Sequence, residues 1–510
     1  YGVPPFDKIE VSDYMPAFRE AMRLHEEEIE AIAENSQEPD FENTVLAFDN
    51  SGEMLTRVEL VFWNVAAADT DPQMQAVQEK VAPMLSKHYD GITLNEKLFD
   101  RIRKVYEKRD EAGLDPLQKR LVEKVYKDFV RSGANLTAEQ KAEFKEINSR
   151  LSELTFRFGK NLLEENARFR MVLGEEEVEG LPSGVRSAAR NAAREAGLGD
   201  EKYLFDIGKP SMLPFLSYSP RRDLRQELYT AYIEKCNHDN EIMELRTRRA
   251  HLLGYGSYAE YVLDDNMAKT PENVYGLLDE IWVPALDRAR EELAEMKELK
   301  RKEDGSDDFA SWDWWYYAEK VRKSRYNLDQ EALRPYFPLE NVKQGIFELS
   351  NRLYGITFRP AVLPVYNDEC VAYEVYDADG SLLGILYMDL HPRAGRKGPG
   401  AWCGTFRDQS YKDGERVIPV VYIVGNFTRP NGNIPALLDL DETTTFFHEF
   451  GHALHALLSD VPYHGLLAVE NDFVELPSQI MENWATEPEM LRSYAIHWQT
   501  GKVIPETLIK

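Results

Sequence analysis

Apolar residues recur at helical spacing along most of the first 200 positions of the chain. The clearest case follows Thr137 and Gln140, a pair typical of a capping box at a helix N-terminus. Apolar residues then follow at steps of three and four, namely Phe144, Ile147, Leu151, Leu154, Phe158 and Leu162. A second stripe covers residues 14–32 and follows Ser12 and Asp13, two capping residue types. We therefore expect long amphipathic helices whose apolar faces form a core.

The pattern changes in the last third of the chain, where β-branched and aromatic residues gather in short runs. Residues 371–376 lead into the turn signal 377–380, and residues 382–388 are typical of a returning strand. A third run, 417–424, contains Pro419. Because proline cannot donate a hydrogen bond to a neighbouring strand, we expect this run to lie at a sheet edge. The sequence thus predicts the mainly α class, with a small β-sheet near its C-terminal part.

With 510 residues, the chain is long enough for two or three packed units. Proline and glycine are densest over residues 182–220, which therefore hold the predicted boundary. We expect an N-terminal helical region at residues 1–205 and a second region at residues 206–510 that carries the sheet.

Charge excludes several classes of function. The chain has 61 Lys and Arg against 89 Asp and Glu, a formal net charge of −28. Such an acidic surface repels phosphate backbones and anionic lipids, so we expect neither a nucleic-acid nor a membrane partner. No apolar run approaches the roughly 20 residues of a membrane helix. The cysteines, Cys236, Cys370 and Cys403, are too few and too widely spaced for a disulfide framework.

The motif that indicates chemistry is His448-Glu449-Phe-Gly-His452, in a helix that we expect to open at Asp441 or Thr443. Side chains four residues apart lie on one helix face, so both imidazoles are placed to bind a single tetrahedral ion. Glu449 follows the first ligand, where its carboxylate reaches metal-bound water and takes its proton. Chance alone gives about 0.02 such patterns in a chain of this composition. The motif therefore predicts a zinc metallopeptidase with Glu449 as general base.

The third ligand distinguishes the classes of zinc peptidase. The metzincin pattern needs Gly at position 455 and His at 458, where this chain has His455 and Leu458. A glutamate from a following helix is the other common solution. Pro477 lies in the first turn of such a helix, because proline lacks a helical donor. This places Glu475 at the helix mouth as the predicted third ligand. Glu482 is an alternative ligand, although a role in orienting a histidine suits it better.

These segments also carry a resemblance to a known family. His448–His455, followed by residues 471–484 (Asn-Asp-Phe-Val-Glu-Leu-Pro-Ser-Gln-Ile-Met-Glu-Asn-Trp), resembles the thimet oligopeptidase and neurolysin family of zinc peptidases. Residues 387–393 and 397–402 look most like its peptidyl-dipeptidase Dcp branch. The likeness runs from end to end and is most specific in the zinc segment.

The resemblance implies one Zn²⁺ per chain, held by His448, His452 and Glu475, with Glu449 as the general base. It also implies a neurolysin-like zincin fold, a helical ellipsoid with a deep channel that admits only short unstructured peptides. The favoured activity is release of C-terminal dipeptides. The alternatives are an oligoendopeptidase of the oligopeptidase A type and a non-catalytic helical peptide-binding scaffold.

The remaining expectations concern the surroundings of this site. Residues 400–406 are the predicted edge along which an extended peptide pairs. The family continues beyond the equivalent of Lys510 with the Tyr and His that stabilise the oxyanion. We therefore expect an incomplete catalytic region that pairs with its own C-terminal segment. We expect a monomer in the cytoplasm, or in the periplasm if a signal peptide precedes Tyr1.

Overall fold

The computed structural model describes residues 1–235, 240–326, 330–412 and 414–509, and 61% of the chain is helical. Cys236 lies outside the described residues. The α-helices are α1 (Val11–Ala33), α2 (Ala47–Asp49), α3 (Glu53–Ala68), α4 (Pro72–Thr93), α5 (Glu96–Lys108), α6 (Pro116–Arg131), α7 (Ala138–Arg168), α8 (Ser183–Glu195), α9 (Lys209–Tyr218), α10 (Arg222–Glu234), α11 (Asn240–Leu252), α12 (Tyr258–Leu263), α13 (Pro271–Asp304), α14 (Trp314–Tyr326), α15 (Leu339–Tyr354), α16 (Leu440–Leu457), α17 (Leu476–Thr486), α18 (Pro488–Tyr494) and α19 (Glu506–Ile509). The strands are β1 (Met171–Leu173), β2 (Tyr203–Phe205), β3 (Thr357–Ala361), β4 (Val371–Tyr376), β5 (Leu382–Asp389), β6 (Trp402–Arg407), β7 (Ser410–Lys412), β8 (Glu415–Val417) and β9 (Val420–Val424).

Helix α7 confirms the predicted capping box. The Gln140 backbone N–H donates to Thr137 Oγ1 at 3.3 Å, and the Thr137 N–H donates to Gln140 Oε1 at 3.1 Å. The first four residues of its apolar stripe are buried. The expectation of burial is wrong for the last two, because Phe158 is exposed and Leu162 is only half-buried. This part of the helix borders a pocket whose other walls include residues of α3 and α4.

The first helix begins slightly earlier than its capping residues suggest. Glu10 is its N-cap, and the Glu10 backbone N–H donates to the Asp13 carboxylate at 2.8 Å. Asp13 therefore lies inside the first turn of the helix, at its third position, and does not precede the helix. The apolar stripe over residues 14–32 is buried as predicted.

A five-stranded sheet has the strand order β3-β4-β5-β9-β6. The predicted hairpin is present as the antiparallel pair β4 and β5. The edge position expected for residues 417–424 is wrong, because β9 pairs with β5 on one side and with β6 on the other. Pro419 lies just before β9, where its carbonyl accepts a hydrogen bond from Ile385 and no ladder donor is lost. The edge strand on this side of the sheet is instead β6, and β3 forms the opposite edge.

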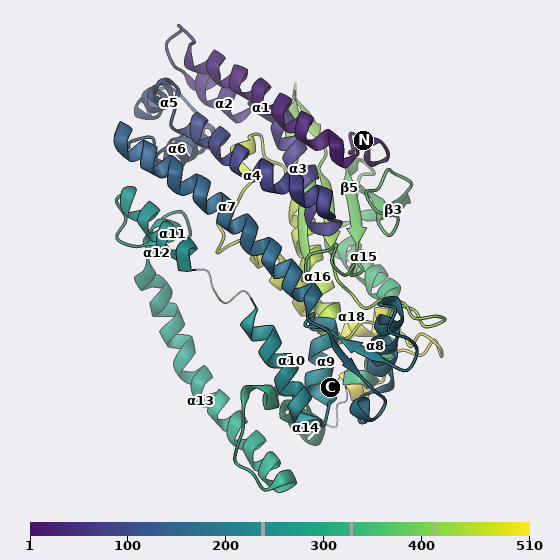
Figure 1. Ribbon diagram of the computed structural model, residues 1–510. Helices are drawn as coiled ribbons and strands as arrows, with labels where there is room; N and C mark the ends of the chain where they lie inside the picture. The colour runs from purple at the N-terminus through teal and green to yellow at the C-terminus, as the bar shows by residue number, and fades with distance from the viewer. Residues whose placement is uncertain (236–239, 327–329, 413, 510) are drawn as a thin grey trace.

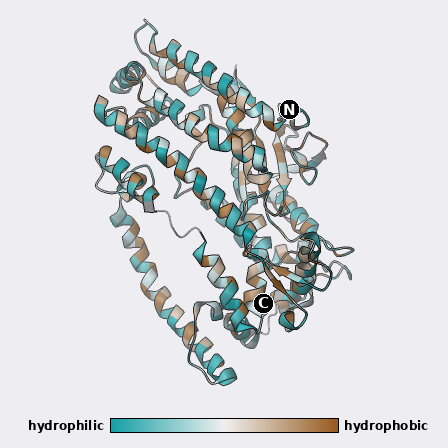
Figure 2. Ribbon diagram, viewed as in Figure 1, coloured by the Kyte–Doolittle hydropathy of each residue, from teal (hydrophilic) through white to brown (hydrophobic). Residues whose placement is uncertain are grey.

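Both faces of this sheet are covered by helices. On β5, Leu386 and Met388 pack with α15, α16 and α17, whereas Ile385 and Tyr387 pack with α1, α3 and α4. Burial on both faces explains why the strand is a nearly continuous apolar run. Figure 1 shows the sheet between these groups of helices, and Figure 2 shows the amphipathic colouring of the helices around it. The mainly α class with a small sheet beside residues 440–457 is confirmed.

Helix α7 joins two parts of the molecule. It packs against α4 on one side and against α11 on the other, and Figure 1 shows it running diagonally between them.

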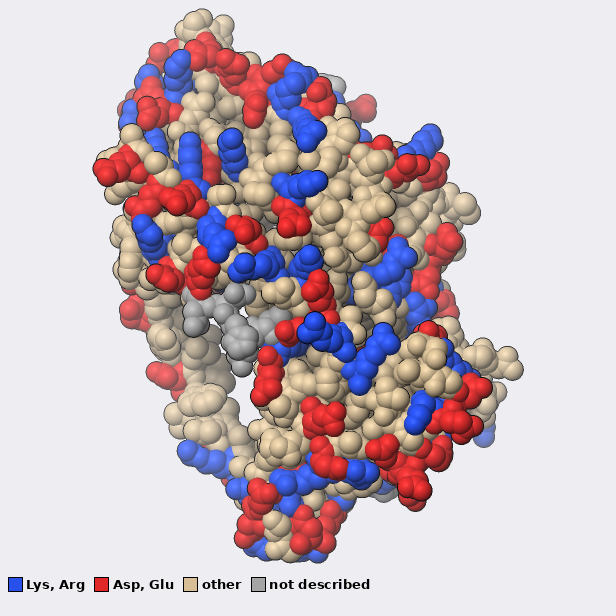
Figure 3. Space-filling view, viewed as in Figure 1, with Lys and Arg blue, Asp and Glu red and all other residues tan. Residues whose placement is uncertain are grey.

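Acidic and basic side chains are interspersed over the face of the molecule shown in Figure 3. Within the described residues, no helix combines the length and apolar character that a bilayer span requires. The division of the chain at residues 205 and 206 stays a prediction.

Candidate metal centre

The helix that carries the motif begins at a capping box that was not predicted. The Asp439 side chain accepts the Glu442 backbone N–H at 2.8 Å, and the Asp439 N–H donates to Glu442 at 2.9 Å. Helix α16 therefore opens at Leu440, and the expected openings at Asp441 or Thr443 are wrong. Both lie inside the first turn, since the box at 439 already satisfies the free N–H groups of the helix end. The Asp-x-x-Glu spacing is the signal that identifies it.

The two histidines project together from α16, and a glutamate meets them from α17. His448 and His452 have ring centroids 5.0 Å apart, and both side chains are half-buried. Glu475, the N-cap residue of α17, brings Oε2 to 3.2 Å from Nε2 of each histidine. Within the described residues, these three form the group whose donor atoms could hold one metal ion.

The spacing of these donors suits zinc. Ligands about 2.0–2.1 Å from a tetrahedral ion lie about 3.3 Å from one another. The two nitrogen-to-oxygen distances of 3.2 Å are close to this value. Two imidazoles and one carboxylate also form a known catalytic zinc set, which leaves a fourth position open. The residues therefore fit a zinc ion.

Glu482 orients the first histidine. Glu482 lies about two helical turns beyond Glu475 in the chain, and its Oε1 is 2.6 Å from His448 Nδ1. When Nδ1–H donates to this carboxylate, Nε2 of His448 carries a lone pair. Nε2 of His448 and Oε2 of Glu475 are then two acceptors only 3.2 Å apart. A cation bound between them stabilises this arrangement. The geometry matches the orienting role expected for Glu482.

Gly451 allows α17 to come this close. A Cβ at this position would lie 2.6 Å from the Pro477 carbonyl oxygen and 2.6 Å from Ser478 Cα. Pro477 lies in the first turn of α17, as predicted. Ser478 donates to Glu475 Oε2 at 2.8 Å, and this hydrogen bond lowers the pKa of Glu475 and favours the carboxylate. Gly451 is not among the predicted site residues, although a glycine inside an amphipathic helix is a signal of close packing.

Glu449 lies beside the donor group and is not part of it. Its side chain is buried, and its Oε2 has no hydrogen-bond partner within the described part of the chain. Burial raises the pKa of Glu449 to about 7, with His448 acting against the shift and Glu475 adding to it. An unpartnered carboxylate of this basicity next to three metal-binding donors is suited to accept a proton from water.

The edge strand of the sheet adjoins this carboxylate. Helix α16 packs on β6, and the Glu449 charge acts on Cys403 of that strand. Burial is the main cause that raises the pKa of the Cys403 thiol, so this cysteine stays protonated. Glu449 therefore lies next to the edge strand β6.

A helical fold with two histidines and a glutamate converging beside a free carboxylate defines a metallopeptidase class. Residues 215–510 match Peptidase family M3. The chain is 38% identical over 522 residues to the dipeptidyl carboxypeptidase of Escherichia coli strain K12, covering 100% of this chain and 76% of that protein. It is 33% identical over 528 residues to oligopeptidase A of the same strain, covering 100% and 77%.

A solved structure titled PZ peptidase A with inhibitor 2 is similar over 96% of this chain and 71% of its own, with 13% identity and a TM-score of 0.46. The chain belongs to peptidase family M3 and is a metallopeptidase. The resemblance stated from the motif and its flanking segments is thereby confirmed.

Proposed function

We propose that the chain hydrolyses short unstructured peptides with one zinc ion held by His448, His452 and Glu475, and that Glu449 is the general base. The observation that carries this proposal is the convergence of three donor atoms next to an unpartnered, buried carboxylate. Peptide hydrolysis itself follows from membership of the family.

Each side chain has a defined part in the reaction. Zinc, when bound, supplies Lewis-acid chemistry that acidifies water and polarises a carbonyl group. Glu449 takes the proton of the attacking water and returns it to the leaving amine. Burial raises the pKa of the Glu449 carboxyl, which favours uptake of a proton. Glu482 holds the His448 ring in the tautomer that a metal ligand needs.

The substrate pairs with the edge strand β6 in this proposal. The strand is unpaired on its outer side in the sheet order, and it lies against the helix that bears Glu449. An extended peptide added there gains backbone hydrogen bonds without a demand on its sequence. This arrangement suits short peptides that have no structure of their own.

The favoured specificity is release of C-terminal dipeptides. It is supported by the higher identity to the dipeptidyl carboxypeptidase, 38%, than to oligopeptidase A, 33%. Such an enzyme recognises a free terminal carboxylate, so an amidated peptide is expected to be a much poorer substrate than the free acid. Equal cleavage of the two forms would favour an endopeptidase of the oligopeptidase A type.

Three variants test the chemistry. Glu449→Gln is expected to keep bound zinc and to lose about 10²–10⁴ in turnover. His452→Ala is expected to lose the zinc as well. His455→Ala is the matched control, because His455 lies one turn further along α16 and outside the donor group. Metal content by mass spectrometry and peptide cleavage by chromatography give both readouts. Zinc binding without hydrolysis by the unmutated protein would favour the non-catalytic scaffold.

A further inference from the structure

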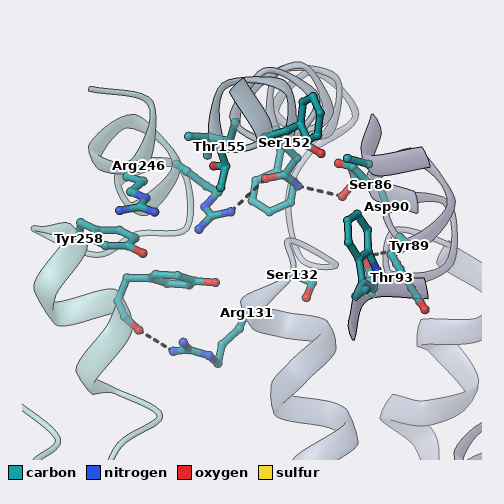
Figure 4. A pocket seen from close by; sticks show the side chains of 18 residues that line it. Ser86, Tyr89, Asp90, Thr93, Arg131, Ser132, Ser152, Thr155, Arg246 and Tyr258 are labelled. Atoms are coloured by element: carbon teal, nitrogen blue, oxygen red, sulfur yellow. Dashed lines mark hydrogen bonds between the residues drawn. The ribbon is translucent and has the colours of Figure 1, made fainter. Parts of the chain in front are cut away.

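A second polar site lies in a pocket of about 560 Å³ lined by residues of α4, α6, α7, α11 and α12. The described residues that line it include none of the metal-centre residues. Figure 4 shows Arg246 and Tyr258 next to each other on one side of the pocket, and Asp90 and Tyr89 of α4 on the opposite side. Its volume is within the range of pockets that bind small ligands or ligand groups.

Two arginines supply the charge of this pocket. Arg246 and Arg249 lie three residues apart on α11, so they share one helix face. Each guanidinium centre lies 5.5 Å from an aromatic ring of α12, Arg246 from Tyr258 and Arg249 from Tyr261. Rings at this distance orient the guanidinium groups without neutralising them.

These two arginines form no ion pair among the described residues, and Asp90 acts on Arg249 only over a longer distance. The buried Nε of Arg249 has no hydrogen-bond partner in the same part of the chain. A third arginine, Arg131, differs because it pairs with Asp264 at 3.1 Å. In a chain with a net charge of −28, an unpaired couple of arginines facing one pocket is unusual.

The acid in the pocket does not cancel this excess. Asp90 accepts a hydrogen bond from Asn148 Nδ2 at 2.8 Å. The oxygen of the same amide accepts from Arg249 Nη1 at 3.3 Å. Asn148 thus stands between the carboxylate and the guanidinium, and one carboxylate faces two arginines. A guanidinium with free N–H groups recognises a carboxylate in a bidentate manner.

A second pocket adjoins the first along α7. It has a volume of about 290 Å³ and shares Thr155 and Phe156 of α7 with the first. It is also lined by Gly398 and Pro399, which lead directly into the edge strand β6. That strand adjoins the helix of Glu449. Thr155 and Phe156 therefore lie between the arginine pocket and a second pocket next to the residues that precede the strand along which the substrate is proposed to lie.

We propose that Arg246 and Arg249 bind a carboxylate of the peptide substrate at a position remote from the scissile bond. The inference rests on the proposed function, because it takes the peptide along β6 and α7 to reach the pocket. The carboxylate is that of an acidic side chain, because the free C-terminus of a substrate that loses a dipeptide lies only two residues from the scissile bond. Acidic residues at one distant position then increase the affinity for the substrate without altering the chemical step.

The test is a series of peptides of equal length in which one glutamate is moved a residue at a time away from the scissile bond. Each peptide is paired with its glutamine version, and both are made as the free acid and as the amide. At one position the glutamate peptide is expected to show a KM about tenfold below its glutamine partner, with equal kcat. A preference that follows only the amide substitution, with no difference between glutamate and glutamine peptides, would overturn the inference.

Arg246→Gln and Arg249→Gln are expected to abolish this preference by raising KM for the acidic peptide alone. Arg248→Gln is the matched control, because Arg248 lies on the same helix with an exposed side chain paired to Glu143. If a glutamine variant unfolds on heating earlier than the control, the lysine variants keep a positive charge and test the same preference.

Three outcomes are distinct. A preference that is lost in the pocket variants and kept in the control supports the inference. Equal KM for every glutamate and glutamine pair, or a preference unchanged in the variants, overturns it while cleavage continues. Absence of cleavage of all peptides by the unmutated protein contradicts the proposed function itself.

Discussion

Gly451 offers a direct test of how two helices build the metal centre. In Gly451→Ala, the new Cβ would lie 2.6 Å from both the Pro477 carbonyl oxygen and Ser478 Cα. Non-bonded carbon atoms prefer separations of about 3.5–4.0 Å. The N-terminal turn of α17 must therefore move away by about 1 Å, and Glu475 moves with it, since it is the N-cap of that helix.

A shift of this size exceeds what the metal site tolerates. Zinc–ligand distances are constrained to about ±0.2 Å, so a displaced Glu475 no longer binds together with the two histidines. Losing the alignment of supporting groups lowers metal affinity by about 10–100-fold, and we expect at least this effect. Overpacking is also expected to destabilise the fold by about 1–3 kcal/mol.

The assay is competition for zinc with a chromophoric chelator, together with urea unfolding followed by circular dichroism. Gly91→Ala is the matched control, because Gly91 lies in α4 and a Cβ there meets no atom within 4 Å. The control is expected to keep its zinc affinity and to gain about 0.5–1 kcal/mol in unfolding free energy. A folded Gly451→Ala protein with unchanged zinc affinity would refute the reasoning.

Two further predictions concern Glu482 and His25. Glu482→Ala removes the acceptor 2.6 Å from His448 Nδ1, so zinc affinity by chelator competition is expected to fall about 10–100-fold; unchanged affinity would exclude the orienting role. Burial lowers the pKa of His25 from 6.5 to about 4, and its Nδ1 lies 3.0 Å from Nε2 of the buried His88. Protonation therefore favours the unfolded chain: the stability is complete above pH 6.5 and is lost as the pH falls toward 4. Between pH 7 and pH 5 this group removes about 2 kcal/mol. Urea unfolding of the unmutated protein and of His25→Gln at both pH values measures it, and an equal loss in both proteins would contradict the assignment.

The local features of this protein were predictable because they depend on residues close in sequence. The box at Thr137 and Gln140 and the apolar stripe behind it required only helical periodicity. The same holds for the i, i+4 placement of His448 and His452 on one helix face. The hairpin of β4 and β5 follows from its turn residues. The capping box at Asp439 and Glu442 was not predicted, but it is also local, and its Asp-x-x-Glu spacing would have been sufficient to predict it.

Tertiary structure decided the features that depend on partners distant in sequence. The position of β9 inside the sheet depends on β6 and β5, which no pattern within residues 417–424 reports. Phe158 continues an apolar stripe, yet it is exposed, because its burial depends on which distant elements pack against that part of α7. The arginine pocket combines helices from residues 72 to 263. Glu475 was predicted as a ligand from its helix mouth, but its 3.2 Å approach to both histidines depends on the packing of α17 against Gly451. Sequence periodicity specifies which face of an element is apolar, whereas the distance between two elements is set only by the side chains, or the missing side chain, at their contact.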